Sequence, residues 1–110
     1  MCIRDRVRVA RQCLRESDTI GRLGGEEFAI VLPNATQDEA AMIASRLRIA
    51  LAAQPLQHAG ATLPLTASIG VACRQAQENG GSLLNRADKA MYQAKREGRD
   101  RIVLAPATVA

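Results

Sequence analysis

The stretch Gly24-Gly25-Glu26-Glu27-Phe28 holds the residues of this chain whose types and spacing best suit chemistry. Glycine accepts backbone φ values above zero and lets a bulky ligand approach the main chain. The carboxylates of Glu26 and Glu27 offer the hard oxygen ligands that divalent cations prefer. A cation beside open glycine backbone suits a triphosphate, so the stretch favours nucleotide chemistry. Taken alone, the two glutamates also fit a solvated polar turn.

The residues around this stretch predict that it forms the tip of a β-hairpin. Residues 18–23 are expected to form a short strand. The apolar run over 28–32 ends at Pro33 and Asn34, which indicates a buried strand followed by a turn. Two strands so close together along the chain would pair, and the paired glycines and glutamates would lie where the chain reverses.

Periodic apolar residues predict the elements up to residue 71. Helical spacing over 7–16 indicates the end of an amphipathic helix. Thr36 with Glu39 fits a capping box, which starts a second helix that runs towards Pro55. The chain then turns over 58–60. Strict alternation over 62–71 predicts one strand with a single face on the core.

The last part of the chain predicts a third helix and a final strand. Gly80-Gly81 is expected to break the chain, and Ser82 to cap the helix that follows. Gly98 suits the position just after the end of that helix, and residues 101–104 form an apolar strand. The expected order is helix, hairpin, helix, strand, helix, strand. This order predicts an α+β, two-layer fold in one domain.

Composition limits the class of protein. The chain has 110 residues, 47% of them hydrophobic, which allows one small domain and argues against disorder. No run of about 18 apolar residues is present, so the sequence predicts no membrane span. The three cysteines show no metal or disulfide spacing and fit a reducing compartment. Residues 1–6 resemble a translated adapter and are interpreted as a non-native leader, and residues 105–110 as a flexible tail.

Four blocks in order make the chain resemble the GGDEF domain family of diguanylate cyclases. The blocks are residues 24–28, Arg15-Glu16-Ser17-Asp18, residues 65–71, and residues 87–95 followed by Gly98-Arg99. The resemblance covers about residues 7–104, interpreted as a partial GGDEF domain. It implies a palm, ferredoxin-like fold that lacks its first helix and first strand in this chain.

The resemblance implies an activity and a cofactor. Members of the family condense two GTP molecules into cyclic di-GMP and pyrophosphate, as dimers of domains with bound Mg²⁺ or Mn²⁺. Glu26 would ligate the metal. Glu27 would assist at the metal or accept the proton of the attacking 3′-hydroxyl. Metal ions serve such phosphoryl transfers by neutralising the triphosphate and aligning attacker and leaving group.

The resemblance also assigns residues to the substrate phosphates. Gly24 and Gly25 would leave room for phosphates against the backbone. Lys95 and Arg99 match the family's phosphate-binding pair, and because they lie four apart, a helix end would point both the same way. The alternative for these two cations is a favourable interaction with the dipole of their own helix.

An inhibitory site is implied upstream of the hairpin. Arg15 and Asp18 match the family's RxxD motif, which binds a cyclic di-GMP dimer, and Arg46 matches a second arginine supplied by a neighbouring domain. Arginine can grip phosphate, and aspartate can accept hydrogen bonds from guanine. The alternative is a polar junction between a helix and a strand.

The sequence also allows functions other than catalysis. A non-catalytic GGDEF module that binds GTP or cyclic di-GMP is the main alternative. A nucleic-acid binder is disfavoured, because only two aromatic residues accompany the net charge of +4. The resemblance implies a homodimer, a cytoplasmic location and a sensor domain upstream in the parent protein. The family's first-strand aspartate and its guanine-reading asparagine and aspartate are not found before Val7, so these 110 residues are expected to be poorly stable and inactive alone.

Overall fold

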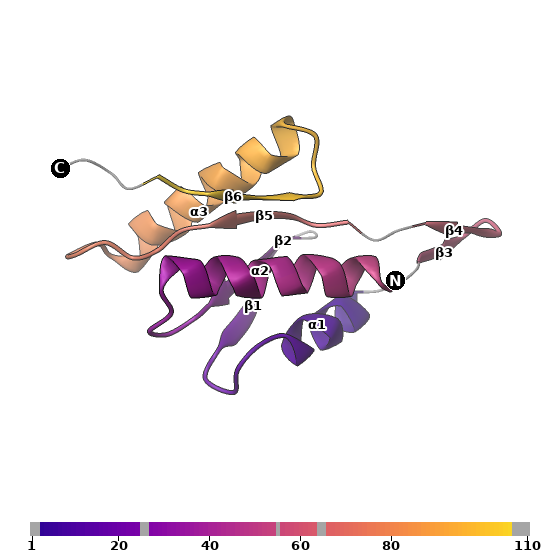
Figure 1. The fold of residues 1–110 in the computed structure, drawn as a ribbon, viewed down its shortest axis with the longest axis horizontal. Helices are drawn as coiled ribbons and strands as arrows, with labels where there is room; N and C mark the ends of the chain where they lie inside the picture. The colour runs from indigo at the N-terminus through magenta and orange to yellow at the C-terminus, as the bar shows by residue number, and fades with distance from the viewer. Residues whose placement is uncertain (1–2, 25–26, 55, 64–65, 107–110) are drawn as a thin grey trace.

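The computed structural model describes residues 3–24, 27–54, 56–63 and 66–106. Within them, helices alternate with short strands in an α+β arrangement (Figure 1). The elements are α1 (Ile3–Gln12), β1 (Thr19–Gly24), β2 (Glu27–Val31), α2 (Gln37–Ala52), β3 (Leu56–His58), β4 (Ala61–Leu63), β5 (Ser68–Val71), α3 (Gly80–Arg96) and β6 (Arg101–Leu104). The strands pair as β1 with β2, β3 with β4, and β5 with β6.

The first helix spans Ile3–Gln12, so it ends four residues before the end that the sequence predicts at residue 16. After Gln12 the backbone N–H groups of Cys13 and Leu14 donate to carbonyls three residues back, and the N–H of Arg15 donates to Asp18 Oδ2 at 2.7 Å, so the helical bonding does not continue. Helix α1 includes residues interpreted as a leader, and the origin of residues 1–6 stays a prediction.

Strands β1 and β2 form the predicted antiparallel hairpin. Thr19 pairs with Val31 and Arg22 with Phe28, and the register shifts before Gly24 pairs with Glu27. The prediction that the second strand is buried is wrong, because its central residues are only half-buried and Val31 at its end is 60% exposed. Side chains alternate between the two faces of a strand. Val31 pairs with the exposed Thr19, and both side chains lie on the solvent-facing side of the hairpin.

Helix α2 begins at the predicted capping box. The backbone N–H of Glu39 donates to Thr36 Oγ1 at 3.1 Å, and the Thr36 hydroxyl donates to Glu39 Oε1 at 3.1 Å. Ala44 and Leu47 on the inner face of the helix are buried. The local pattern therefore fixes both the start of α2 and the face that it turns inward.

The prediction of one strand over 62–71 is wrong. The structure has a small hairpin, β3 with β4, and a separate strand β5. Ala59 and Gly60 connect β3 to β4 with φ values of 52° and 80°, the left-handed conformations that tight hairpin turns require. Residues 64–65 lie outside the described residues. In Figure 1, α2 and α3 lie on opposite sides of β5, and its residues are half-buried up to the buried Val71, so neither face of β5 is fully exposed to solvent.

Strands β5 and β6 are parallel, from Ser68 opposite Arg101 to Val71 opposite Leu104, and α3 connects them. A β-carbon added at Gly70 would collide with the backbone of α3 at Ala87 and Met91. Strand and helix therefore pack at a distance that only glycine permits. The buried apolar residues include many small ones: Val9, Ala10, Ala44, Leu47, Val71, Ala90, Ala94 and Ala105.

Helix α3 begins two residues before the predicted cap. Asn79 is the N-cap, and its Oδ1 accepts from the backbone N–H of Ser82 at 2.8 Å. Gly80 and Gly81 therefore belong to the first turn and do not break the chain. At the other end, Gly98 has φ 122°, and the Arg99 N–H donates to Ala94 O at 2.9 Å. This geometry confirms the predicted terminating role of Gly98.

Candidate active site

The signature hairpin meets the C-terminal end of α3. Lys95 Nζ lies 3.7 Å from Glu27 Oε1, although the two residues belong to distant parts of the chain. Their side chains are 32% and 46% exposed, so both charged groups remain accessible to a ligand. The fold thus places a carboxylate of the signature beside a cation of the predicted phosphate pair.

The backbone before Glu27 is open. Gly24 has φ 152°, and a β-carbon built there would have no atom within 4 Å. This free space is consistent with the predicted approach of a phosphate to the main chain. Gly25 and Glu26, the other predicted phosphate-binding and metal-binding residues of the stretch, lie outside the described residues.

Arg99 lies in a turn after α3, whereas the sequence predicts that it belongs to the end of the helix. The helix ends at Arg96, and Arg99 lies beyond it with φ 63°, so the prediction that Lys95 and Arg99 share a helical face is wrong. The backbone takes positive φ values from Gly98 onward, and this turn sets the direction of the Arg99 side chain. Among the described residues, the exposed Arg99 side chain forms no ion pair, which leaves its guanidinium available.

Arg15 and Asp18 are bound to each other. Arg15 Nη2 donates to Asp18 Oδ1 at 2.8 Å, and Arg15 Nε lies 3.1 and 3.2 Å from the two carboxylate oxygens. The Asp18 side chain is 0% exposed and that of Arg15 is 41% exposed. Hydrogen bonds from the Arg15 side chain lower the pKa of Asp18, and the same pairing raises the pKa of Arg15.

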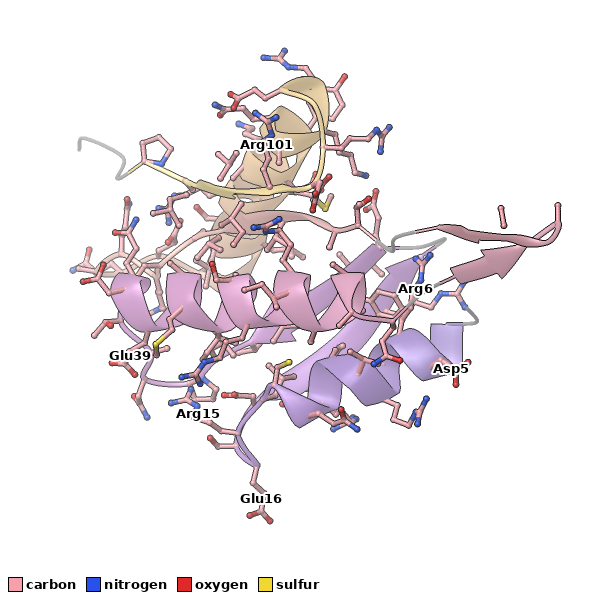
Figure 2. All side chains as sticks on the ribbon, turned by 45° about the vertical axis from the view of Figure 1, so that its right-hand side comes forward. Asp5, Arg6, Arg15, Glu16, Glu39 and Arg101 are labelled. Carbon is pink, nitrogen blue, oxygen red and sulfur yellow. The ribbon has the colours of Figure 1, made fainter. Side chains whose placement is uncertain are left out.

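This pair also fastens the helix-to-strand junction to the rest of the chain. Arg15 Nη2 donates to the carbonyl of Pro33 at 2.9 Å. Figure 2 shows Arg15 and Glu39 on the same side of the molecule, and the Glu39 carboxylate contributes to the raised pKa of Arg15. Arg46 lies two turns further along α2, where its Nη2 is 3.8 Å from Met42 Sδ. Arg15 and Asp18 thus contribute structural contacts at this junction, and their predicted inhibitory site with Arg46 stays a prediction.

Comparison with known proteins shows the family to which the chain belongs. The family model described as "Diguanylate cyclase, GGDEF domain" matches residues 1–101. The chain belongs to the GGDEF family. Its α+β fold is that of solved GGDEF domains: it superposes on the GGDEF domain of DgcB from Caulobacter crescentus, solved in complex with c-di-GMP, with a TM-score of 0.82 and 31% identity.

Two curated relatives of this GGDEF chain are diguanylate cyclases by name. It is 42% identical over 95 residues to diguanylate cyclase DgcP of Pseudomonas aeruginosa, covering 86% of this chain and 14% of DgcP. It is 37% identical over 99 residues to diguanylate cyclase DgcM of Escherichia coli, covering 89% of this chain and 23% of DgcM. The structural match with DgcB covers 96% of this chain and 63% of the DgcB chain. The GGDEF chain therefore spans a small part of these curated relatives.

A metal site of the GGDEF chain is not assembled by the described residues alone. Among them, no group of three or more His, Cys, Asp or Glu side chains could hold a metal ion. A shallow hollow of about 300 Å³ on α3 is lined by Asp88, Lys89, Tyr92, Gln93 and Arg96, and by neither Glu27 nor Lys95. Within the residues that the structure describes, no helix is both long and apolar enough to traverse a bilayer.

One contact near the GGDEF site has no signal in the sequence. Arg48 Nη1 of α2 donates to Asp100 Oδ1 at 3.1 Å, next to Arg99. The partners are 52 residues apart, and no local spacing links an arginine within a helix to an aspartate in a turn. Only the tertiary fold brings them together.

Proposed function

We propose that the chain is the part of a GGDEF domain that holds the triphosphate during condensation of two GTP molecules into cyclic di-GMP and pyrophosphate. The contact between Glu27 and Lys95 is the observation that carries this proposal, because it joins the signature hairpin to the expected phosphate ligands. Membership of the GGDEF family and relatives named diguanylate cyclases support the same activity.

Lys95 and Arg99 are proposed to bind oxygens of the β- and γ-phosphates. Among the described residues, Lys95 pairs with one carboxylate, that of Glu27, and the Arg99 guanidinium has no ion-pair partner. A triphosphate offers several anionic oxygens to both cations at once, so it can compete with Glu27 for Lys95. Both cations would then stabilise the charge that develops on the leaving pyrophosphate.

The proposed cofactor is Mg²⁺ or Mn²⁺. Magnesium is commonly held by one or two carboxylates together with substrate phosphates, so a solvent-accessible Glu27 next in sequence to Glu26 fits such an ion. Glu26 is proposed as the metal ligand and Glu27 as its neighbour at the metal or at the 3′-hydroxyl. When bound, the ion would neutralise phosphate charge and lower the pKa of the attacking hydroxyl.

The reaction joins two nucleotides, so we propose that two such domains face each other as a homodimer. Arg15, Asp18 and Arg46 are the proposed site for cyclic di-GMP as an inhibitor. Because Asp18 is fully buried against Arg15, a ligand that uses both side chains must first separate them. A cytoplasmic location and an upstream sensor belong to the same proposal.

A chimera tests the proposed activity. Residues 7–104 replace the matching segment of diguanylate cyclase DgcM, and cyclic di-GMP formed from GTP and Mg²⁺ is measured by liquid chromatography. We expect synthesis by the chimera. Glu26→Ala and Lys95→Ala are each expected to lower kcat/KM by about 100-fold or more, because each removes a group that meets developing charge. Lys89→Ala, which removes an exposed lysine elsewhere on α3, is the matched control and should retain activity.

The outcomes separate the enzyme from its alternative. A folded chimera that binds GTP but forms no cyclic di-GMP would indicate the non-catalytic module. The 110-residue chain alone is expected to form none, because the family's first-strand aspartate and guanine-reading residues were not found in it. Synthesis by the isolated chain would contradict this second expectation.

A further inference from the structure

The turn that carries Arg99 has an unusual backbone. Gly98, Arg99 and Asp100 have φ values of 122°, 63° and 47°, three left-handed conformations in succession. Only the first of these residues is a glycine, for which such values are readily accessible. Non-glycine residues keep left-handed conformations where the surrounding structure imposes them. The contacts that hold this turn therefore decide where the Arg99 side chain emerges.

Three hydrogen bonds hold the turn from different sides. The Arg99 N–H donates to Ala94 O at 2.9 Å, which ties the turn to α3. Arg101 Nε donates to the Arg99 carbonyl at 3.1 Å, and Figure 2 shows Arg101 beside the turn at the end of α3. The third bond, from Arg48 Nη1 to Asp100 Oδ1 at 3.1 Å, is the one of the three that comes from a distant element.

We infer that Arg48 is a positioning residue for phosphate binding by Arg99. This inference rests on the proposed function, in which Arg99 is a phosphate ligand. The Arg99 side chain has no ion-pair partner of its own among the described residues, so its direction depends on the backbone. By holding Asp100, Arg48 fixes the residue that follows Arg99 and limits the conformations that the free turn samples. A turn arranged in advance loses less entropy when it binds phosphate.

Arg48 acts through the turn and not by touching the ligand. Its guanidinium is already bound to Asp100, and both side chains are partly exposed, at 35% and 46%. An ion pair of this kind contributes little to the stability of the whole chain. The effect of losing it should therefore appear in phosphate affinity more than in the unfolding midpoint.

A double-mutant cycle on the whole 110-residue chain tests the inference. The probe is inorganic triphosphate with Mg²⁺, and affinity is measured by isothermal titration calorimetry. Arg48→Ala is expected to weaken binding about two- to fivefold, with partial recovery in Arg48→Lys. In an Arg99→Ala background, Arg48→Ala should cause no further loss, because Arg48 acts through Arg99. Arg8→Ala, which breaks the exposed ion pair between Arg8 and Asp5 on α1, is the matched control and should leave affinity unchanged.

Each outcome has a distinct meaning. Unchanged affinity in Arg48→Ala would overturn the inference, and so would an equal loss in the Arg99→Ala background. In both cases the unchanged chain still binds triphosphate, and the proposed phosphate site stands. If the unchanged chain binds no triphosphate, the proposed phosphate site fails, and the inference that rests on it fails as well.

Discussion

At the scale of single residues, the clearest physical effect is the buried carboxylate of Asp18. The family resemblance predicts that Asp18 belongs to an inhibitory site, and the structure shows its buried oxygens accepting hydrogen bonds from Arg15 just before β1. Spacing alone could not separate a ligand site from a structural junction, because both use an arginine and an aspartate three residues apart. The contact with Pro33 made by Arg15 is what favours a structural contribution.

The pairing of Asp18 predicts acid sensitivity of folding. Hydrogen bonds from Arg15 lower the pKa of Asp18 below its ordinary value of 3.8, so the unfolded chain binds a proton more readily than the folded one. The resulting stability is present above the ordinary pKa and is lost as pH falls through the lower, folded-state pKa. Asp18→Asn should therefore flatten the fall of the urea midpoint from about pH 5 downward.

The matched control for that experiment is Glu16→Gln, since Glu16 points away from the junction in Figure 2. This variant should keep the acid dependence of the unchanged chain. Part of the dependence should also survive in Asp18→Asn, because a backbone hydrogen bond from Gln75 and contacts with Ser82 and Arg86 lower the pKa of Glu78. An Asp18→Asn variant with the full acid dependence would refute the role given to the Arg15 contact.

At the scale of secondary-structure elements, the close packing of β5 on α3 depends on one glycine. A β-carbon at Gly70 would collide with the α3 backbone, which cannot give way as a flexible side chain could. Gly70→Ala should destabilise the chain by about 1–3 kcal/mol, the range for overpacking a core, as measured by urea unfolding. Helix α3 also carries Lys95, so a displaced helix would alter the contact with Glu27.

Gly21→Ala is the paired control for this packing. Gly21 lies in strand β1, and a β-carbon there would have no atom within 4 Å. Its substitution should change stability by no more than about 0.5 kcal/mol. Equal stability of Gly70→Ala and Gly21→Ala would show that α3 does not pack against β5 as closely as described.

The elements that could be predicted from the sequence are those set by local chemistry. The capping box at Thr36 and the terminating Gly98 act within one turn of their helices, so neighbouring residues suffice to identify them. The strand over 62–71 could not be predicted correctly, because alternation reports one solvated face and β5 lies between two helices. The predicted cap of α3 is wrong for a different reason: Asn79 and Ser82 are both good cap residues, and residue type alone does not choose between them.

The candidate site likewise has residues that the sequence predicts and contacts that only the fold reveals. The signature at Gly24 and Glu27, and the cations Lys95 and Arg99, were predicted from residue types in order along the chain. The way Arg99 is held was not, because it depends on a left-handed turn and on Arg48 from α2. Interactions between side chains far apart in sequence leave no periodic signal, so only the fold reveals them.

At the scale of the whole molecule, the two larger strand pairs differ in how well they are covered. Strands β5 and β6 contact both α2 and α3, and Val71 is buried. The β1–β2 pair forms a sheet of its own, in which Leu23 and Val31 are exposed and the strand residues are at most partly buried. Local opening costs less free energy where fewer apolar contacts are broken.

This difference predicts two levels of protection from hydrogen exchange. Backbone amides of β1 and β2 should exchange at least about ten times faster than those of β5 and β6, corresponding to a difference of about 1.4 kcal/mol or more in opening free energy. Exchange followed by NMR can compare Ile20, which is paired with Ile30, against Ile69, which is paired with Ile102. Inorganic triphosphate with Mg²⁺ should slow exchange in β2 if Glu27 and Lys95 enclose one ligand site. Equal protection of both strand pairs would show that the chain opens as a single cooperative unit, and the hairpin would then not be the weaker part of the fold.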